Sequence, residues 1–181
     1  MKKKTVLIGV TGSIAAYKAC ELVRALTKKG IEAVCVMTKE AREFLTPLTL
    51  QALSGNKVYE DMFEAPEKHE IRHISLAERA DLIVIFPATA NVIAKLAAGI
   101  CDDLLTCTVV AARCPAILAP AMNTAMYENA ITKDNIKRLK KYGFHFIGPS
   151  SGRLASGAEG VGRLADIHSV MKAAAGLLKL K

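Results

Sequence analysis

The sequence has no tryptophan, and only 5% of its residues are aromatic although 51% are hydrophobic. Its core must therefore be built from Ala, Val, Ile and Leu, which favours helices packed on a parallel sheet. No apolar run approaches the ~18 to 20 residues that cross a bilayer. The first run breaks at Gly9, too early for a secretory signal. We expect a cytoplasmic protein without a membrane partner, folded as one domain over residues 1–181.

A CxxC pair is also absent, and the cysteines lie in apolar segments. In a reducing compartment this pattern is typical of buried structural thiols rather than disulfides or metal ligands. The five residues are Cys20, Cys35, Cys101, Cys107 and Cys114. The net charge is +8, but neither exposed aromatic residues among the basic clusters nor a nucleic-acid-binding module is present. A small anionic substrate is a better partner than nucleic acid.

Short runs of β-branched and apolar residues alternate with segments of helical periodicity. The predicted strands are residues 5–10, 33–37, 81–86, 116–119 and 144–147. The predicted helices are residues 14–29, 39–55 with a break at Pro47, 90–98, 103–112, 132–142 and 166–178, with a polar connection over 56–72. This alternation predicts an α/β fold with a doubly wound, mostly parallel sheet and helices on both faces.

Ligands of such sheets bind beyond the carboxyl ends of the strands, so the turns there are informative. The turn at Gly12 and Ser13 lacks both GxGxxG and GxxxxGK[ST] spacing, which disfavours dinucleotide and nucleoside triphosphate sites. A small turn before a helix can still receive a single phosphate or the edge of a flavin. The alternative is that Ser13 is an ordinary helix N-cap.

Two further strand ends carry small and polar residues. Thr89 and Asn91 follow Pro87, and Asn123 lies between Met122 and Met126. An amide in an apolar setting is expected where a carboxylate must be oriented. In the simpler interpretation Thr89 caps a helix, the methionines fill the core and Asn123 is a turn residue.

Five segments together resemble the ordered motifs of the homo-oligomeric flavin-containing cysteine decarboxylases. They are residues 12–18, 73–76, 87–91, 99–106 and 120–127, and the likeness runs from about residue 5 to about residue 168. Within that family the chain is most similar to the phosphopantothenoylcysteine decarboxylases, without a fused ligase domain. The resemblance implies a Rossmann-like flavoprotein fold and FMN-dependent decarboxylation of 4'-phospho-N-pantothenoylcysteine to 4'-phosphopantetheine in coenzyme A biosynthesis.

The resemblance also assigns roles to individual residues. His73 matches the catalytic histidine, and Asn123 matches the asparagine that orients the substrate carboxylate. The positions implied to bind FMN are Gly12, Ser13, Ile14, Thr38, Lys39, Glu40, Thr89, Ala90, Asn91, Val92, Thr106 and Ala121. The positions implied to bind substrate are Asn123, Met126, Ala155, Gly157 and Arg163. A homotrimer or larger homo-oligomer with FMN between subunits is implied, and a separate phosphopantothenate-cysteine ligase is a further expected partner.

His73 also ends a literal HExxH, which begins at His69 and includes Glu70. On a helix this spacing would bind zinc with Glu70 as the base. Leu76 and Arg79 stand where the longer zinc motif has its Gly and third His, and the zinc interpretation leaves the strand-end turns unexplained. We therefore predict no metal site.

Residues 150–164 resemble a flexible flap that covers the substrate. Its glycines, Gly152, Gly157, Gly160 and Gly162, would supply mobility. Ser156 takes the catalytic position at which the family has a cysteine proton donor. Three alternatives remain open: another acid replaces that donor, the reaction stops at the ene-thiol, or Ser156 is an engineered replacement.

Two further alternatives share the predicted fold. The first is a different flavin enzyme, either an oxidative decarboxylase of peptidyl-cysteine or a flavin prenyltransferase-like protein. The second is a flavin-binding regulatory subunit without enzymatic activity, against which the presence of His73 and Asn123 argues.

Overall fold

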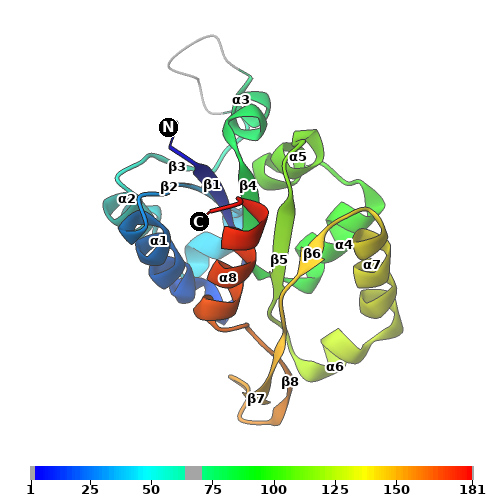
Figure 1. Ribbon diagram of the computed structural model, residues 1–181. Helices are drawn as coiled ribbons and strands as arrows, with labels where there is room; N and C mark the ends of the chain where they lie inside the picture. The colour runs from blue at the N-terminus through cyan, green and yellow to red at the C-terminus, as the bar shows by residue number, and fades with distance from the viewer. Residues whose placement is uncertain (1–2, 64–70, 181) are drawn as a thin grey trace.

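The computed structural model describes residues 3–63 and 71–180 and is built around a six-stranded parallel sheet (Figure 1). The strand order is β3-β2-β1-β4-β5-β6. The strands are β1 (Thr5–Val10), β2 (Glu32–Met37), β3 (Val58–Tyr59), β4 (Leu82–Ala88), β5 (Ala116–Pro120) and β6 (His145–Phe146). A separate antiparallel hairpin consists of β7 (Ser150–Arg153) and β8 (Glu159–Arg163).

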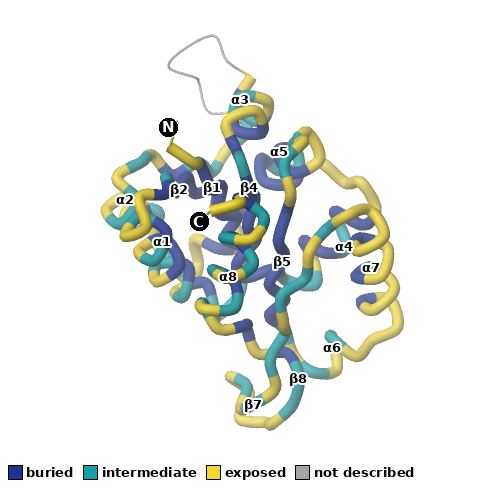
Figure 2. Tube along the Cα trace, in the orientation of Figure 1, coloured by how far each residue is buried: buried dark blue, intermediate teal, exposed yellow. Residues whose placement is uncertain are grey.

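Helices cover both faces of the sheet, because the central strands are apolar on both sides. Val6, Ile8 and Val10 of β1 pack on one face, and Leu7 packs on the other. The helices of the first face are α1 (Ala19–Lys28), α2 (Pro47–Ser54) and α8 (Ile167–Leu177). The helices of the second face are α3 (Arg72–Arg79), α4 (Ala90–Ala98), α5 (Leu104–Ala111) and α7 (Ala130–Lys141). Figure 2 shows the sheet as the buried centre between these layers.

Three shorter helices complete the described chain. They are the 3-10 helices η1 (Ile14–Lys18) and η2 (Lys39–Glu43) and the α-helix α6 (Thr124–Glu128). The chain moves from β1 outward to β2 and β3, then returns to pair β4 with the other side of β1. The connection after β1 therefore leads to β2 on one side of the sheet, and the connection after β4 leads to β5 on the other side. Doubly wound folds bind ligands at the crevice where the strand order reverses in this way.

The predicted fold class is confirmed, and the differences lie in short or polar elements. The connection at 56–72 contains the two-residue strand β3 and leads into α3, a mostly polar helix whose buried apolar residues are Leu76 and Ala77. The break expected at Pro47 is present, because η2 ends at Glu43 and Pro47 begins α2, where proline's missing N–H is no loss. Residues 150–164, expected as a flexible flap, contain the β7–β8 hairpin.

The prediction of buried thiols holds for Cys35 and is wrong for Cys101. Cys35 is completely buried in β2, and burial raises the pKa of its thiol to about 12. Cys101 is exposed, because Gly99 ends α4 in the left-handed conformation and the chain then runs along the surface. Cys20, Cys107 and Cys114 are partly buried. Within residues 3–63 and 71–180, no helix has the length and apolarity needed to span a bilayer.

Candidate active site

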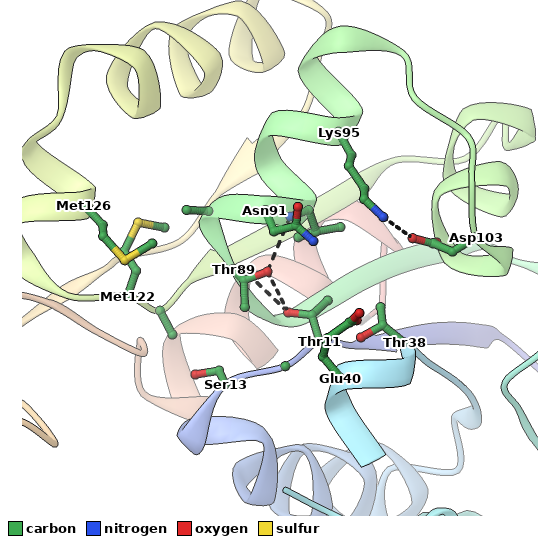
Figure 3. Close-up of a pocket in the computed structure, with 14 residues that line it drawn as sticks. Thr11, Ser13, Thr38, Glu40, Thr89, Asn91, Lys95, Asp103, Met122 and Met126 are labelled. Atoms are coloured by element: carbon green, nitrogen blue, oxygen red, sulfur yellow. Dashed lines mark hydrogen bonds and ion pairs between the residues drawn. The ribbon is translucent and has the colours of Figure 1, made fainter. Parts of the chain in front are cut away.

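Direct hydrogen bonds hold together the turns that follow β1, β4 and β5. The buried hydroxyl of Thr11 donates to the Pro87 carbonyl oxygen at 2.7 Å, and the Thr89 N–H donates to the Thr11 oxygen at 3.2 Å (Figure 3). The Ala121 N–H in turn donates to the Ala88 carbonyl oxygen at 3.0 Å. These contacts confirm that the three predicted turns converge at one edge of the sheet.

A cavity of about 330 Å³ opens where these turns meet, and we call it the strand-end cavity. Its volume lies within the range of small-molecule sites. Small apolar groups form part of its wall, while hydroxyl, amide and carboxylate groups form the rest. The lining residues are Thr11, Gly12, Ser13, Thr38, Glu40, Thr89, Ala90, Asn91, Val92, Lys95, Asp103, Ala121, Met122 and Met126.

Three hydroxyl side chains in this cavity also cap the helices that start there. Ser13 Oγ accepts from the Ala15 N–H at 3.2 Å, and Thr38 Oγ1 accepts from the Ala41 N–H at 3.4 Å. Thr89 Oγ1 accepts from the Val92 N–H at 3.4 Å. The capping interpretation of Ser13 and Thr89 is therefore correct, and it is compatible with their position on the cavity wall.

Gly12 permits the turn after β1 to lie directly against η2. A Cβ added at Gly12 would lie 2.4 Å from the Cβ of Glu40, closer than nonbonded carbons approach one another. Replacing Gly12 would therefore push apart two walls of the strand-end cavity.

A lysine in an ion-pair cluster also lines this cavity. Lys95 Nζ lies 2.8 Å from Asp102 Oδ1 and 3.0 Å from Asp103 Oδ2. The hydrogen bond with Asp102 is the main cause that raises the pKa of Lys95, and the same bond lowers the pKa of Asp102. Thr106, predicted to bind FMN, is instead buried in a capping box with Asp103 at the start of α5.

A second cavity of about 600 Å³, here the hairpin cavity, lies between the hairpin, η1 and the loop after β5. Its lining residues are Ser13, Ile14, Ala15, Tyr17, Lys18, Met122, Asn123, Arg153, Leu154, Ala155, Ser156, Gly162, Arg163 and Leu164. Ser13 and Met122 line both cavities, so the two spaces are adjacent.

The hairpin is fixed to the β5 loop by close backbone packing. The Met122 N–H donates to the Gly162 carbonyl oxygen at 3.0 Å. Gly162 has φ +143°, and a Cβ there would lie 2.2 Å from the Met122 carbonyl oxygen. A Cβ at Gly160 would similarly lie 2.3 Å from Thr124 Oγ1. Sequence reasoning assigned these two glycines to mobility, whereas the structure gives them a packing role.

Asn123 combines a turn role with an available donor. Its Oδ1 accepts from the Ala125 N–H at 2.8 Å and caps α6. Its exposed Nδ2 makes no hydrogen bond to any residue that the structure describes. The amide N–H groups are therefore free to bind an acceptor in the hairpin cavity.

His73, predicted as the catalytic histidine, lies apart from the two cavities. It is the second residue of α3, half-buried, and lines neither cavity. In Figure 1, α3 lies at the top of the view and the hairpin at the bottom. His69 and Glu70, the start of the HExxH, lie outside the described residues. Among residues 3–63 and 71–180, no three His, Cys, Asp or Glu side chains gather into a metal site.

Most other predicted residues do meet at the two cavities. Gly12, Ser13, Thr38, Glu40, Thr89, Ala90, Asn91, Val92, Ala121 and Met126 line the strand-end cavity. Ile14, Asn123, Ala155, Ser156 and Arg163 line the hairpin cavity, while Lys39, Thr106 and Gly157 line neither.

Sequence reasoning gave no role to several residues that line the cavities. They are Thr11, Lys95, Asp103, Ala15, Tyr17, Lys18, Arg153, Leu154 and Leu164. Thr11 could have been found, because it directly follows a strand. Lys95 lies one helical turn after Asn91 and therefore shares its face of α4.

Comparisons with known proteins agree with this geometry. Residues 1–179 match the family model described as Flavoprotein. The chain is 46% identical over 171 residues to a probable phosphopantothenoylcysteine decarboxylase from Streptococcus mutans, covering 93% of this chain and 96% of that protein. It is 47% identical over 174 residues to the coenzyme A biosynthesis bifunctional protein CoaBC of Bacillus subtilis, covering 96% of this chain but only 43% of that protein.

A solved structure extends the similarity to the fold. A mutant PPC decarboxylase complexed with pantothenoylaminoethenethiol superposes with a TM-score of 0.88 at 33% identity, covering 98% of this chain and 100% of that one. The chain therefore belongs to the Flavoprotein family, and its resemblance to the flavin-containing cysteine decarboxylases is confirmed.

Proposed function

We propose that the chain is an FMN-dependent decarboxylase that converts 4'-phospho-N-pantothenoylcysteine to 4'-phosphopantetheine in coenzyme A biosynthesis. The observation that carries this proposal is the continuity of the two cavities through Ser13 and Met122, with the free amide of Asn123 in the outer one. A cofactor in the strand-end cavity would thus lie beside a substrate in the hairpin cavity. The names of the relatives in coenzyme A biosynthesis support the same substrate.

The donor set of the strand-end cavity suits FMN. Ala90, Val92 and Ala121 offer small apolar contacts for a flat ring, while Ser13, Thr38 and Asn91 offer hydroxyl and amide groups for polar edges. The bound flavin would supply the redox chemistry that makes decarboxylation of a cysteine derivative easy. Solved neighbours described as FMN-dependent cysteine decarboxylases or FMN binding proteins support this choice of cofactor.

The residues of the hairpin cavity would bind and enclose the substrate. Asn123 Nδ2 is available to donate to its carboxylate, because Asn123 Oδ1 is already held by the Ala125 N–H. Ala155 and Ser156 lie on the hairpin side of the cavity, where they would limit the access of water.

We infer that the catalytic site is completed by a second copy of the chain. His73 is needed for proton handling but lines neither cavity of its own subunit. A homotrimer in which α3 of one subunit faces the cavities of its neighbour would bring His73 to Asn123, with FMN between subunits. A ring of head-to-tail contacts produces such sites at every interface.

The chain spans under half of the bifunctional relatives and nearly all of the streptococcal one. We infer that a phosphopantothenate-cysteine ligase activity supplies the substrate, and that both reactions take place in the cytoplasm.

A second candidate function is oxidative decarboxylation of a peptidyl-cysteine. Among the described residues no cysteine lines either cavity, and Ser156 is the hairpin hydroxyl that faces the substrate space. A serine hydroxyl is a far weaker acid than a thiol of pKa ~8.5. Without a thiol donor, the reaction would stop at a product two hydrogens short.

Purified protein should be yellow and should release FMN on denaturation. Incubation with 4'-phospho-N-pantothenoylcysteine should release carbon dioxide, and mass spectrometry would show whether the product is reduced. A peptide with a carboxyl-terminal cysteine is the competing substrate. A colourless protein, or turnover of the peptide alone, would refute the proposal.

A further inference from the structure

The hairpin cavity carries positive charge without a compensating acid. Lys18, Arg153 and Arg163 line it, whereas no aspartate or glutamate is among its described lining residues. The strand-end cavity differs, because Lys95 there is accompanied by Glu40 and Asp103. The excess of positive charge is therefore confined to the outer cavity.

These three cations are also unpaired. Across residues 3–63 and 71–180, none of them forms an ion pair with a carboxylate. Glu159 lies directly opposite Arg153 in the hairpin register, yet the two side chains make no ion pair. Arg153 and Arg163 are exposed and Lys18 is half-buried, so all three can reach a ligand from solvent.

The cations come from three different elements that meet only in the folded chain. Lys18 ends η1, Arg153 ends β7 and Arg163 ends β8. The Arg163 side chain lies over Gly152, where an added Cβ would be 3.4 Å from Nη1. The docking of β8 on Met122 thus holds one arginine near the wall to which Lys18 belongs.

The substrate carboxylate can be bound by the amide N–H groups of Asn123, so it does not account for three cationic side chains in the same cavity. A phosphate monoester carries about −1.5 to −2 charges near pH 7 and three acceptor oxygens. Arginine and lysine are the side chains that bind such groups by charge-assisted hydrogen bonds. The cavity therefore indicates a ligand that carries both a carboxylate and a phosphate monoester.

We propose that Lys18 and Arg153, together with Arg163, bind the phosphate of the substrate and select phosphorylated over unphosphorylated pantothenoylcysteine. This inference rests on the proposed function and assigns a specificity role to Lys18 and Arg153. The phosphate is that of the substrate rather than of FMN, because Lys18, Arg153 and Arg163 line the hairpin cavity and not the strand-end cavity.

The test compares two substrates that differ only in the phosphate. Lys18→Ala and Arg153→Ala should each raise KM for 4'-phospho-N-pantothenoylcysteine about 10-fold, the effect of one charged hydrogen bond. KM for N-pantothenoylcysteine should change much less, so that the preference for the phosphorylated substrate falls about 10-fold, while the FMN content matches wild type. The matched control is Lys137→Ala, which removes one charge from an exposed position of α7 outside both cavities.

A binding measurement separates this inference from the proposed reaction. Calorimetry with 4'-phosphopantetheine and pantetheine measures the subsite without turnover. If wild type decarboxylates neither substrate but binds the phosphorylated compound preferentially, and Lys18→Ala and Arg153→Ala abolish that preference, the proposed function fails and the subsite stands. Equal KM changes for both substrates, or loss of FMN from the variants, would overturn the subsite.

Discussion

The hydroxyl of Thr11 donates a 2.7 Å hydrogen bond to the carbonyl oxygen of Pro87, which lies 76 residues further along the chain. This bond joins the turn after β1 to the end of β4. Because the Thr89 N–H also donates to Thr11, a single side chain fixes two walls of the strand-end cavity.

Thr11→Val keeps the shape of this side chain but removes its oxygen. The buried Pro87 carbonyl and the Thr89 N–H would lose their partner, at a cost of about 1–3 kcal/mol in the free energy of unfolding. We also expect weaker retention of FMN. Urea unfolding and the FMN-to-protein absorbance ratio measure the two effects, and unchanged stability would contradict the role given to Thr11.

Gly162→Ala should detach the hairpin from the β5 loop, since the added Cβ would lie 2.2 Å from the Met122 carbonyl oxygen. We expect kcat/KM to fall roughly 10- to 100-fold, the usual result of misplaced substrate contacts. Gly176→Ala in α8 is the control, because nothing lies within 4 Å of its added Cβ. That change should stabilise the protein by about 0.5–1 kcal/mol. A wild-type kcat/KM for Gly162→Ala would contradict the role given to the packing of Gly162 on Met122.

The carboxylate of Glu32 accepts hydrogen bonds from Arg79 at 2.7 Å and from the Thr5 hydroxyl at 2.9 Å. Partial burial alone would raise the pKa of Glu32, but these bonds outweigh it and lower that pKa. A lowered folded-state pKa stabilises the protein above the unfolded pKa of ~4.3, and this contribution is lost as pH falls through the folded pKa. Glu32→Gln should cost about 0.5–1 kcal/mol at pH 7. In urea titrations at a series of pH values, the two proteins should converge once the pH falls below the lowered folded-state pKa of Glu32.

Ser156→Cys introduces a thiol into the hairpin cavity. If proton donation limits the reductive step, the variant should convert 4'-phospho-N-pantothenoylcysteine to the fully reduced product faster than wild type does. Mass spectrometry of quenched reactions distinguishes the two products by two hydrogens. Equal rates and equal products in both proteins would exclude Ser156 as the limiting position.

Mixing two inactive variants tests whether His73 acts in a neighbouring subunit. His73→Asn and Asn123→Ala should each lose turnover while staying yellow. Coexpressed, they should recover roughly a quarter of wild-type activity, because random assembly places both intact residues at one interface in four. No recovery in a verified mixed oligomer would indicate that each subunit contains its own complete site.

The strands that could be predicted from the sequence are those formed by continuous runs of apolar residues. The runs that form β1, β2, β4 and β5 are continuously apolar, as strands covered on both faces must be. β3 has only two residues, and of the eight residues of α3 the buried ones are Arg72, Leu76 and Ala77. β3 is placed by its pairing with β2, and α3 contacts β2 through the bond from Arg79 to Glu32, which lie 47 residues apart.

The residues of the candidate site likewise include some that the sequence predicts and some that only the folded structure reveals. Ser13, Asn91 and Asn123 lie in strand-end turns, where both topology and resemblance point to a ligand. Lys18 and Arg153 are unremarkable surface cations in the sequence, since only the docking of β8 on Met122 brings their elements to one cavity. His73 lines neither cavity of its own chain, so a single chain does not show which side chains it would act with.

The division of the site into two compartments joined at Ser13 and Met122 has an evolutionary consequence. Hairpin residues other than Gly160 and Gly162, which pack on the β5 loop and α6, can change without disturbing the turns that surround the strand-end cavity. The substrate specificity can therefore change while the cofactor site is kept. A scaffold of this kind can serve both a metabolic enzyme and a peptide-tailoring enzyme, because the two need differ only in the β7–β8 hairpin.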